Sequence, residues 1–339
     1  RMDDPDMASE AVENGTCDIV SLGRPLLADP DYVNKLRAGR REDIRPCISC
    51  QEGCMGRVQE YSMINCAVNP QAARERVTAY EPILKSKKVM IVGGGVAGCE
   101  AARVLAVRGH RPELFEKSGC LGGNLIPGGA PEFKEDDLAL AKWYETALKK
   151  LEVPVHLHTE VKKEDVLQAD YDAVIVATGS SPKVFPLGDD AHVYTAAQVL
   201  TKEKDCGSST VIVGGGLVGC ETALWLAQHG KKVTIVEALD KLMAVNGPLC
   251  HANKDMLERL IPYNGVDVVT GAKVTGFQNG ELSYLVQNEE RTISCDSVIL
   301  SVGYREENTL YNDLQFDIPE IYLLGDAKKV SNIMYAIWD

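Results

Sequence analysis

The sequence has no long apolar run, although 45% of its 339 residues are hydrophobic. Crossing a bilayer as a helix takes roughly 18 or more consecutive apolar residues, and no segment approaches that length. The overall balance is typical of a soluble globular protein, with 25% charged and 6% aromatic residues. We therefore predict no membrane span.

Positive charge is also scarce. The chain has 36 Lys and Arg against 49 Asp and Glu, which gives a formal net charge of −13 and a pI near 5.0. A surface of this sign repels phosphate backbones on average. We expect no nucleic-acid partner.

The beginning of the chain lacks an initiator methionine and the apolar core of a signal peptide. We therefore expect the chain to be part of a longer protein. At about 100 to 200 residues per domain, two or three domains fit, and each is large enough to bury its own core.

Eleven cysteines cannot all pair in internal disulfides, and a chain of this length needs no such staples. This usage favours a reducing, cytoplasmic compartment. Seven cysteines are scattered, and we expect them to act as small apolar residues. The seven are Cys17, Cys99, Cys120, Cys206, Cys220, Cys250 and Cys295. The other four, Cys47, Cys50, Cys54 and Cys66, lie close together in the sequence.

Two glycine-rich segments repeat almost the same sequence. Residues 89–100 read VMIVGGGVAGCE and residues 210–221 read TVIVGGGLVGCE. Each follows an apolar, β-branched run and precedes a helical pattern, and a second strand then ends at Glu116 or Glu237. This pattern predicts two βαβ units with right-handed crossovers.

The residue types suit dinucleotide binding. The first glycine of each motif permits a tight turn, the second lets the backbone approach a pyrophosphate, and the third lets the helix pack on the strand. Glu116 and Glu237 can accept hydrogen bonds from a ribose. Glu237 is followed by Ala238 with no adjacent arginine, and its carboxylate would repel a 2′-phosphate, so the second unit favours NADH over NADPH.

These motifs resemble the glutathione-reductase-like flavoproteins, in which a first unit binds FAD and a second unit, inserted into it, binds NAD(P)H. The resemblance implies an α/β fold with two nested Rossmann-like dinucleotide-binding domains. It implies FAD contacts at Gly93, Gly95, Ala97, Gly98, Glu116, Lys117, Gly123, Asn124, Leu125, Ala177, Thr178, Gly179, Gly325 and Asp326. It implies NAD contacts at Gly214, Gly216, Val218, Gly219, Glu237 and Gly303.

No Cys-x-x-x-x-Cys pair follows the first glycine motif, so electrons must leave the FAD by a route other than a redox disulfide. The four clustered cysteines offer soft thiolate ligands for a tetrahedral zinc or an iron-sulfur cluster. Zinc sites usually show two Cys-x-x-Cys pairs. Three cysteines within eight residues and one distant cysteine favour a 4Fe-4S cluster, with zinc as the alternative.

The cysteine spacing is similar to that of the iron-sulfur branch of the old-yellow-enzyme family, which includes 2,4-dienoyl-CoA and 2-enoate reductases. Residues 17–30 also resemble the end of that family's FMN-binding (β/α)8 barrel, of which only one strand, over residues 18–22, is present. By this resemblance Gly23 and Arg24 would hold the FMN phosphate. The proton donor lies outside this chain, and we assign no catalytic residue.

The resemblance implies four parts. Residues 1–46 are the remnant of the FMN barrel, residues 47–86 form the cluster loop and a linker, residues 87–185 and 304–339 bind FAD, and residues 186–303 bind NADH. Electrons would pass from NADH to FAD, then through the cluster to FMN for alkene reduction. The alternative is a trimethylamine dehydrogenase-like module that holds ADP structurally and sends electrons to a partner flavoprotein. A small-molecule substrate would bind in the missing barrel, and the sequence is compatible with a homo-oligomer.

Overall fold

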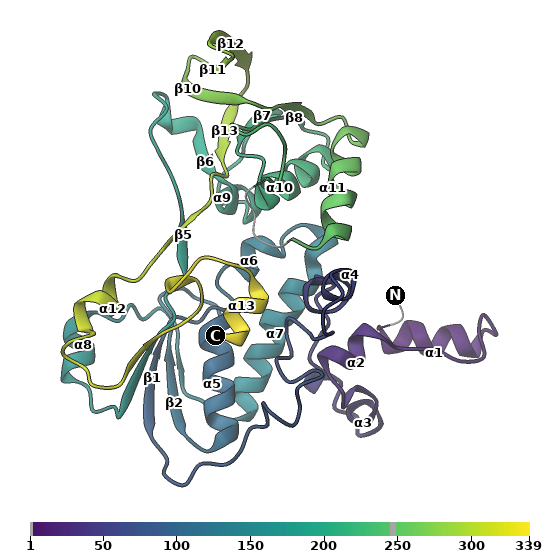
Figure 1. The fold of residues 1–339 in the computed structure, drawn as a ribbon, viewed down its shortest axis with the longest axis vertical. Helices are drawn as coiled ribbons and strands as arrows, with labels where there is room; N and C mark the ends of the chain where they lie inside the picture. The colour runs from purple at the N-terminus through teal and green to yellow at the C-terminus, as the bar shows by residue number, and fades with distance from the viewer. Residues whose placement is uncertain (1–2, 245–248) are drawn as a thin grey trace.

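The computed structural model describes residues 3–244 and 249–339. Two α/β units lie one above the other, and the N-terminal segment, from residue 3 to the helix before residue 60, lies beside the lower unit (Figure 1). The lower unit, here the first unit, contains both the segment after residue 87 and the C-terminal end of the chain.

The first unit is built on a five-stranded parallel sheet in the order β15-β4-β1-β2-β3. Its strands are β1 (Lys88–Val92), β2 (Arg111–Phe115), β3 (Val155–His156), β4 (Ala173–Val176) and β15 (Ile321–Leu323). Its helices are α5 (Val96–Arg108), α6 (Leu125–Gly128), η3 (Glu132–Lys134), α7 (Glu135–Lys150), α8 (Lys163–Gln168), α12 (Thr309–Leu314), η5 (Gly325–Ala327) and α13 (Ile333–Trp338).

The second unit repeats this plan with the sheet order β6-β13-β7-β8-β9 and adds the antiparallel sheet β10-β11-β12. Its strands are β6 (Val193–Thr195), β7 (Ser209–Val213), β8 (Lys232–Val236), β9 (Asp267–Val269), β10 (Ala272–Gln278), β11 (Glu281–Val286), β12 (Glu289–Ser294) and β13 (Ser297–Leu300). Its helices are η4 (Asp190–His192), α9 (Ala196–Leu200), α10 (Leu217–Gln228) and α11 (His251–Tyr263).

Two short strands join the units. After β4 the chain leaves the first unit through β5 (Ser180–Pro182) and returns through β14 (Tyr304–Glu306), and these strands pair antiparallel. The second unit is therefore inserted between β4 and β15 of the first. The predicted nested pair of Rossmann-like units is confirmed.

The predicted βαβ pattern follows from the sequence in both units. Strands β1 and β7 each have four buried residues in a row, as expected for parallel strands covered on both faces. The helices then begin at Gly95 and Gly216, which adopt the extended conformation of a helix N-cap. Gly109 ends α5 with a φ of 100°, a left-handed conformation that glycine adopts without strain.

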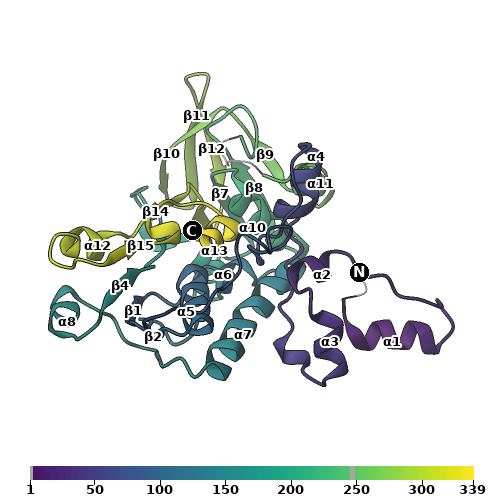
Figure 2. The ribbon, with the colours of Figure 1, turned by 60° about the horizontal axis from the view of Figure 1, so that its bottom comes forward.

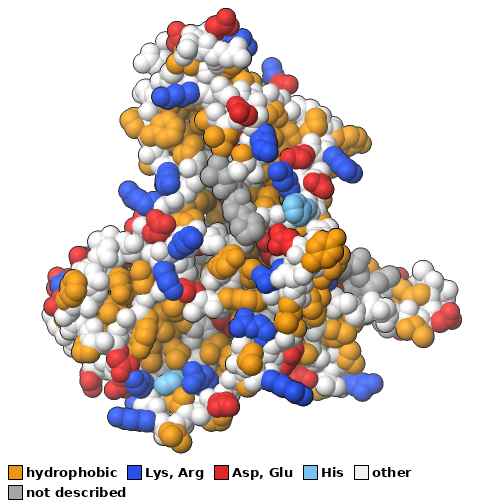
Figure 3. All heavy atoms as spheres, in the orientation of Figure 1, with side chains coloured by type: hydrophobic (Ala, Val, Ile, Leu, Met, Phe, Trp, Pro, Cys, Tyr) orange, Lys and Arg blue, Asp and Glu red, His pale blue; other side chains and the backbone are white. Residues whose placement is uncertain are grey.

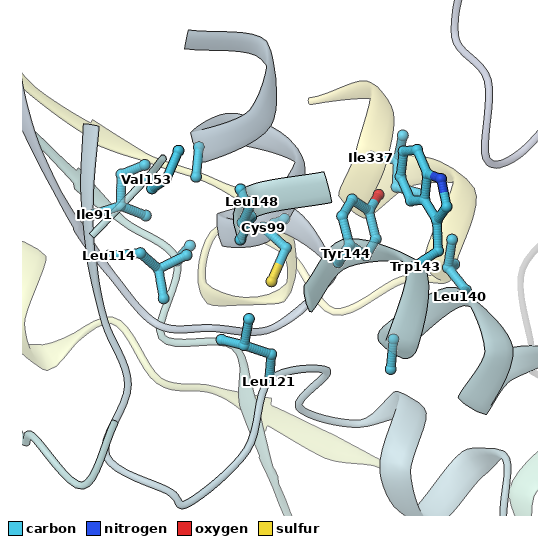
Figure 4. Packing of buried hydrophobic residues seen from close by; sticks show 14 of the residues in the cluster. Ile91, Cys99, Leu114, Leu121, Leu140, Trp143, Tyr144, Leu148, Val153 and Ile337 are labelled. Carbon is cyan, nitrogen blue, oxygen red and sulfur yellow. The ribbon is translucent and has the colours of Figure 1, made fainter. Parts of the chain in front are cut away.

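The core of the first unit lies between α5, α7 and the sheet. Cys99 and Ala102 on α5 and Leu140, Tyr144 and Leu148 on α7 are fully buried. Figure 4 shows Cys99, Tyr144 and Leu148 close together in this core, where α7 crosses α5. This packing fixes the helix whose N-terminus follows the first glycine motif.

The N-terminal segment is mostly helical and irregular. It contains α1 (Pro5–Glu13), α2 (Arg24–Ala28), α3 (Tyr32–Arg37), η1 (Arg41–Asp43), the π-helical turn η2 (Glu52–Gly56) and α4 (Arg57–Gln59). Figure 2 shows α1 and α3 projecting from the body of the molecule. The strand predicted for residues 18–22 is wrong. These residues belong to no strand, because no neighbouring strand in the described residues offers ladder hydrogen bonds.

Among the described residues, none of the helices combines the length and the apolar character that crossing a bilayer requires. Acidic and basic side chains are interspersed over the face shown in Figure 3. That face carries no continuous basic stripe of the kind that binds nucleic acid.

Candidate functional site

In the first glycine motif, Gly93 and Gly98 pack tightly against backbone atoms, whereas Gly95 faces open space. A Cβ placed on Gly93 would lie 2.2 Å from the Ala177 carbonyl oxygen, and one on Gly98 would lie 1.9 Å from the Gly93 carbonyl oxygen. A Cβ on Gly95 would meet no atom within 4 Å. Gly95 therefore faces open space at the N-terminus of α5, where a pyrophosphate would be held by backbone N–H groups.

The second motif reproduces this geometry. A Cβ on Gly214 would lie 2.3 Å from the Ser301 carbonyl oxygen, and one on Gly219 would lie 2.0 Å from the Gly214 carbonyl oxygen. Gly216 begins α10 as Gly95 begins α5. The sequence repeat is thus a repeat of backbone shape to within about a tenth of an ångström in these contacts.

Glu116 and Glu237 brace the two turns in the same way. Glu116 accepts hydrogen bonds from the backbone N–H groups of Gly94 (2.6 Å) and Ser118 (2.7 Å). Glu237 accepts from Gly215 (2.5 Å) and Leu239 (2.7 Å). Each carboxylate oxygen keeps a second lone pair, so both residues fit the ribose-binding role that the sequence predicts.

Three segments far apart in the sequence meet beside the first glycine turn. Asn124 Nδ2 lies 3.5 Å from Ser180 Oγ, and Ser180 Oγ donates to Asp326 Oδ2 at 2.9 Å. Ala97 also contacts the third segment, because a Cβ on Gly325 would lie 2.7 Å from its side chain. The predicted FAD residues Asn124, Gly325 and Asp326 therefore converge, and Ser180, which joins them, was missed by the sequence reasoning.

The other predicted residues of the nucleotide sites lie around these turns. In the first unit, Gly123 approaches the Cα of Gly95, and Thr178 Oγ1 donates to the Glu307 carbonyl. The rest are exposed Lys117, buried Leu125, Gly179 after β4, Val218 on α10 and Gly303 before β14. Gly179 and Gly303 have open space where a Cβ would project.

A partly buried ion pair joins the two units, and the sequence reasoning missed it. Lys134 Nζ lies 3.1 Å from Glu221 Oε1 on α10 and 3.8 Å from Asp137 Oδ2 on α7. Burial raises the pKa of Asp137 to about 6, and the nearby lysine opposes this shift. The signal available in the sequence was Glu221 itself, which ends the repeated Gly-Cys-Glu tripeptide.

The four predicted ligand cysteines come together. Cys47, Cys50, Cys54 and Cys66 line one cavity, called here the cysteine cavity, together with Arg24, Leu27, Ile48, Gln51, Gly53, Ala67 and Val68. The π-helical turn η2 brings Cys54 back toward Cys50, and Cys66 returns to the cavity because the Asn65 N–H donates to the Gly53 carbonyl (2.8 Å).

The environment of the cavity is apolar but supplies backbone N–H groups to sulfur. Burial, with smaller contributions from the other three cysteines, raises the pKa of the Cys50 thiol to about 12, although the backbone N–H of Glu52 lowers it. Burial also raises the pKa of Cys66, opposed by the N–H groups of Val68 and Asn69. N–H groups directed at ligand sulfurs are typical of iron-sulfur sites.

Within residues 3–244 and 249–339, no three His, Cys, Asp or Glu side chains lie close enough to ligate a single metal ion. The four cysteines are among the residues that line the cysteine cavity. Four soft thiols in one lining are ligands that an iron-sulfur cluster or a zinc ion could use.

A second cavity adjoins the first. It is lined by Asp3, Ser21, Leu22, Gly23, Arg24, Pro25, Gln51 and Met55. Arg24 and Gln51 line both cavities. The two residues predicted to hold the FMN phosphate, Gly23 and Arg24, therefore lie directly beside the cysteine cavity, and the Arg24 guanidinium fits a phosphate partner.

A duplicated nucleotide fold with an intact glycine turn in each copy defines a pyridine-nucleotide-dependent flavin oxidoreductase. The sequence matches the family described as pyridine nucleotide-disulphide oxidoreductase over residues 87–337, and the chain belongs to that family. It is an oxidoreductase, and its two glycine turns fit FAD and a pyridine nucleotide.

Similarity to individual proteins extends beyond residues 87–337 and includes the N-terminal segment. The chain is 49% identical to a cinnamate reductase of Clostridium sporogenes over 338 residues, which is 100% of this chain and 51% of the relative. It is 38% identical to a bilirubin reductase of Mediterraneibacter gnavus, covering 96% of this chain and 50% of the relative. The chain thus spans about half the length of these relatives.

Solved structures also match essentially the whole of this chain with about half of their own length. A 2-naphthoyl-CoA reductase complex superposes with a TM-score of 0.93 at 30% identity, over 100% of this chain and 52% of the other. A histamine dehydrogenase from Rhizobium sp. superposes with a TM-score of 0.85 at 25% identity, over 99% and 53%. The predicted resemblance to the C-terminal portion of an enoate-reductase-type protein is confirmed.

Proposed function

We propose that this chain is the NADH-oxidising, electron-transfer portion of an iron-sulfur alkene reductase. Its electrons come from NADH and leave through a 4Fe-4S cluster to an FMN, which a barrel domain would hold together with the alkene substrate. The protein would act in the cytoplasm. The observation that carries this proposal is the cysteine cavity, in which four thiols and Arg24 share one lining.

The chain's own residues perform the binding and positioning. Backbone N–H groups at the starts of α5 and α10 face the two pyrophosphate positions, and Glu237 sets the charge that disfavours a 2′-phosphate. The Lys134–Glu221 ion pair links the two units. When bound, FAD and the cluster supply the conversion of a two-electron donor into single electrons.

Relatives support the substrate class. Cinnamate, bilirubin and 2-naphthoyl-CoA, which are named for the reductases similar to this chain, are all unsaturated organic molecules. We expect the residues that contact such a substrate to lie in the barrel domain, of which this chain would hold only the end. We therefore propose an alkene of this general kind as the electron acceptor.

The test is an anaerobic titration of the purified protein with NADH, followed by its visible spectrum, with iron and acid-labile sulfide measured on the same sample. We expect NADH to bleach the flavin absorbance, and about four iron and four sulfide per chain. Zinc without sulfide would overturn the cluster. Flavin that stays oxidised with NADH would favour a second unit that holds ADP structurally.

A further inference from the structure

Two cysteines of the cysteine cavity have their backbone carbonyl groups held by side chains from outside the cysteine loop. Asn253 Nδ2 donates to the Cys50 carbonyl at 3.0 Å. Trp338 Nε1 donates to the Cys66 carbonyl at 3.1 Å. Asn253 lies on α11 of the second unit and Trp338 ends α13 of the first. Each nucleotide-binding unit therefore supplies one donor to the loop.

Asn253 is itself held in place. Gln51 Nε2 lies 3.5 Å from its Oδ1, so the amide both donates to the loop and accepts from it. Next to it, the backbone N–H of Cys250 at the start of α11 donates to Glu52 Oε1 at 3.2 Å. These contacts fix α11 against the turn that carries Cys50.

Trp338 is held by stacking and by its helix. The Arg74 guanidinium lies 5.2 Å from the centre of its ring, a cation–π contact. Helix α13 packs against α5, the helix of the first glycine motif. Helix α13 thus contacts both α5, which begins at the first glycine motif, and the carbonyl of Cys66.

Each held carbonyl shares its peptide plane with the N–H of the next residue, Gln51 or Ala67, so the two donors orient the backbone on the carboxyl side of both cysteines. Hydrogen bonds to the sulfurs stabilise the more negative, reduced state of an iron-sulfur cluster and raise its reduction potential. Residues that orient the ligands therefore tune the cluster without touching it.

We propose that Asn253 and Trp338 are positioning residues for the iron-sulfur cluster, which hold the Cys50 and Cys66 peptides so that the cluster accepts electrons more readily. This inference rests on the proposed function, because it requires the cysteine cavity to contain a cluster. Neither residue belongs to a motif that the sequence analysis identified.

The test uses Asn253→Leu, which removes the amide that donates to the Cys50 carbonyl and keeps a side chain of similar bulk, and Trp338→Phe, which removes the indole N–H and keeps an aromatic ring. Asn264→Leu is the matched control at the C-cap of α11, since Asn264 donates to the Leu260 carbonyl of that helix at 2.7 Å. Trp225→Phe is the matched indole control, since Trp225 donates to Glu132.

Each variant, made in the whole natural chain and purified without air, is assayed for iron, sulfide and FAD. Its cluster is then titrated by electron paramagnetic resonance against solution potential. We expect Asn253→Leu and Trp338→Phe each to lower the ratio of reduced to oxidised cluster about tenfold at a fixed potential, which is about 59 mV for one electron. The reduction potential of FAD in both variants should stay at the wild-type value. The cluster potential in both control variants should also stay at the wild-type value.

The outcomes separate the two claims. Wild-type protein without iron and sulfide would overturn the proposed function itself. A variant that keeps its cluster at the wild-type potential overturns the role of that residue. A variant that loses iron and sulfide but keeps its FAD supports the inference, because the ligands are then no longer positioned. A variant that loses FAD as well has a general structural defect, and that residue leaves the proposal.

Discussion

Glu100 and Glu221 occupy the same place in the two copies of the repeat, yet they have different partners. Glu100 pairs with Arg103 at 2.6 Å inside the first unit, and both side chains are more than nine-tenths buried. Glu221 pairs with Lys134 across the junction of the units. Duplication fixed the position of the carboxylate, and the neighbouring surface determined its partner.

The glycines of the first motif allow a test of the FAD site. Gly95→Ala should reduce bound FAD at least tenfold while leaving the thermal midpoint of the apoprotein nearly unchanged, because its Cβ meets only the space for the pyrophosphate. Gly98→Ala should destabilise the apoprotein by about 3 kcal/mol, because its Cβ would overlap the Gly93 carbonyl. FAD absorbance per chain and thermal unfolding measure the two effects. Normal FAD content in Gly95→Ala would contradict the assignment.

Asp137 gives a pH prediction. Burial raises its pKa from 3.8 to about 6, so between about pH 4 and pH 6 the folded protein binds more protons than the unfolded chain, and this group's contribution to stability falls as pH rises. Asp137→Asn removes that loss. Relative to wild type, the variant should gain about 2 to 3 kcal/mol between pH 4 and pH 7. Denaturant unfolding at both pH values measures the gain, and exposed Asp267→Asn should show none.

At the scale of elements, η3 of the first unit and α10 of the second make polar contacts across the junction of the two units. Besides the Lys134–Glu221 pair, Trp225 Nε1 donates to Glu132 Oε2 at 3.1 Å and His229 Nε2 lies 3.4 Å from Glu132 Oε1. All of these contacts join a three-residue turn of the first unit to one face of α10.

Lys134→Met should therefore destabilise the protein by roughly 2 kcal/mol, which is less than the ~3–5 kcal/mol of a fully buried pair because 30% of the lysine side chain is exposed. It should also slow flavin reduction by NADH, measured by stopped-flow absorbance. Adding Glu221→Gln should cost little more, since the two residues act as a pair. Exposed Lys142→Met is the control, and an equal effect of both lysine variants would contradict the role of the junction.

The elements also show where sequence reasoning succeeds. Apolar β-branched runs before the glycine motifs predicted β1 and β7 because parallel strands are buried on both faces and leave a continuous apolar run. The strand predicted for residues 18–22 failed because a strand requires hydrogen-bonded neighbours, and its apolar residues carry no information about whether those neighbours are present.

At the scale of the whole molecule, the cysteine cavity and the first nucleotide site are formed by different residues, and α13 contacts both. Cys50→Ser should abolish the iron and sulfide content but leave bleaching of FAD by NADH, because the cavity that Cys50 lines includes no residue of either glycine motif. Metal analysis and an anaerobic NADH titration measure both. Cys17→Ser, outside the cavity, should change neither, and loss of FAD bleaching in Cys50→Ser would contradict the separation of the sites.

The sequence by itself determined the two nucleotide folds, their acidic residues and the group of four cysteines, because each of these depends on residues within one βαβ unit or one loop. Only the tertiary structure decided which distant residues meet. Lys134 and Glu221 are 87 positions apart, and Cys66 and Trp338 are 272 apart. Such pairs form because packing of whole helices brings their surfaces together, and no local periodicity records which surfaces those are.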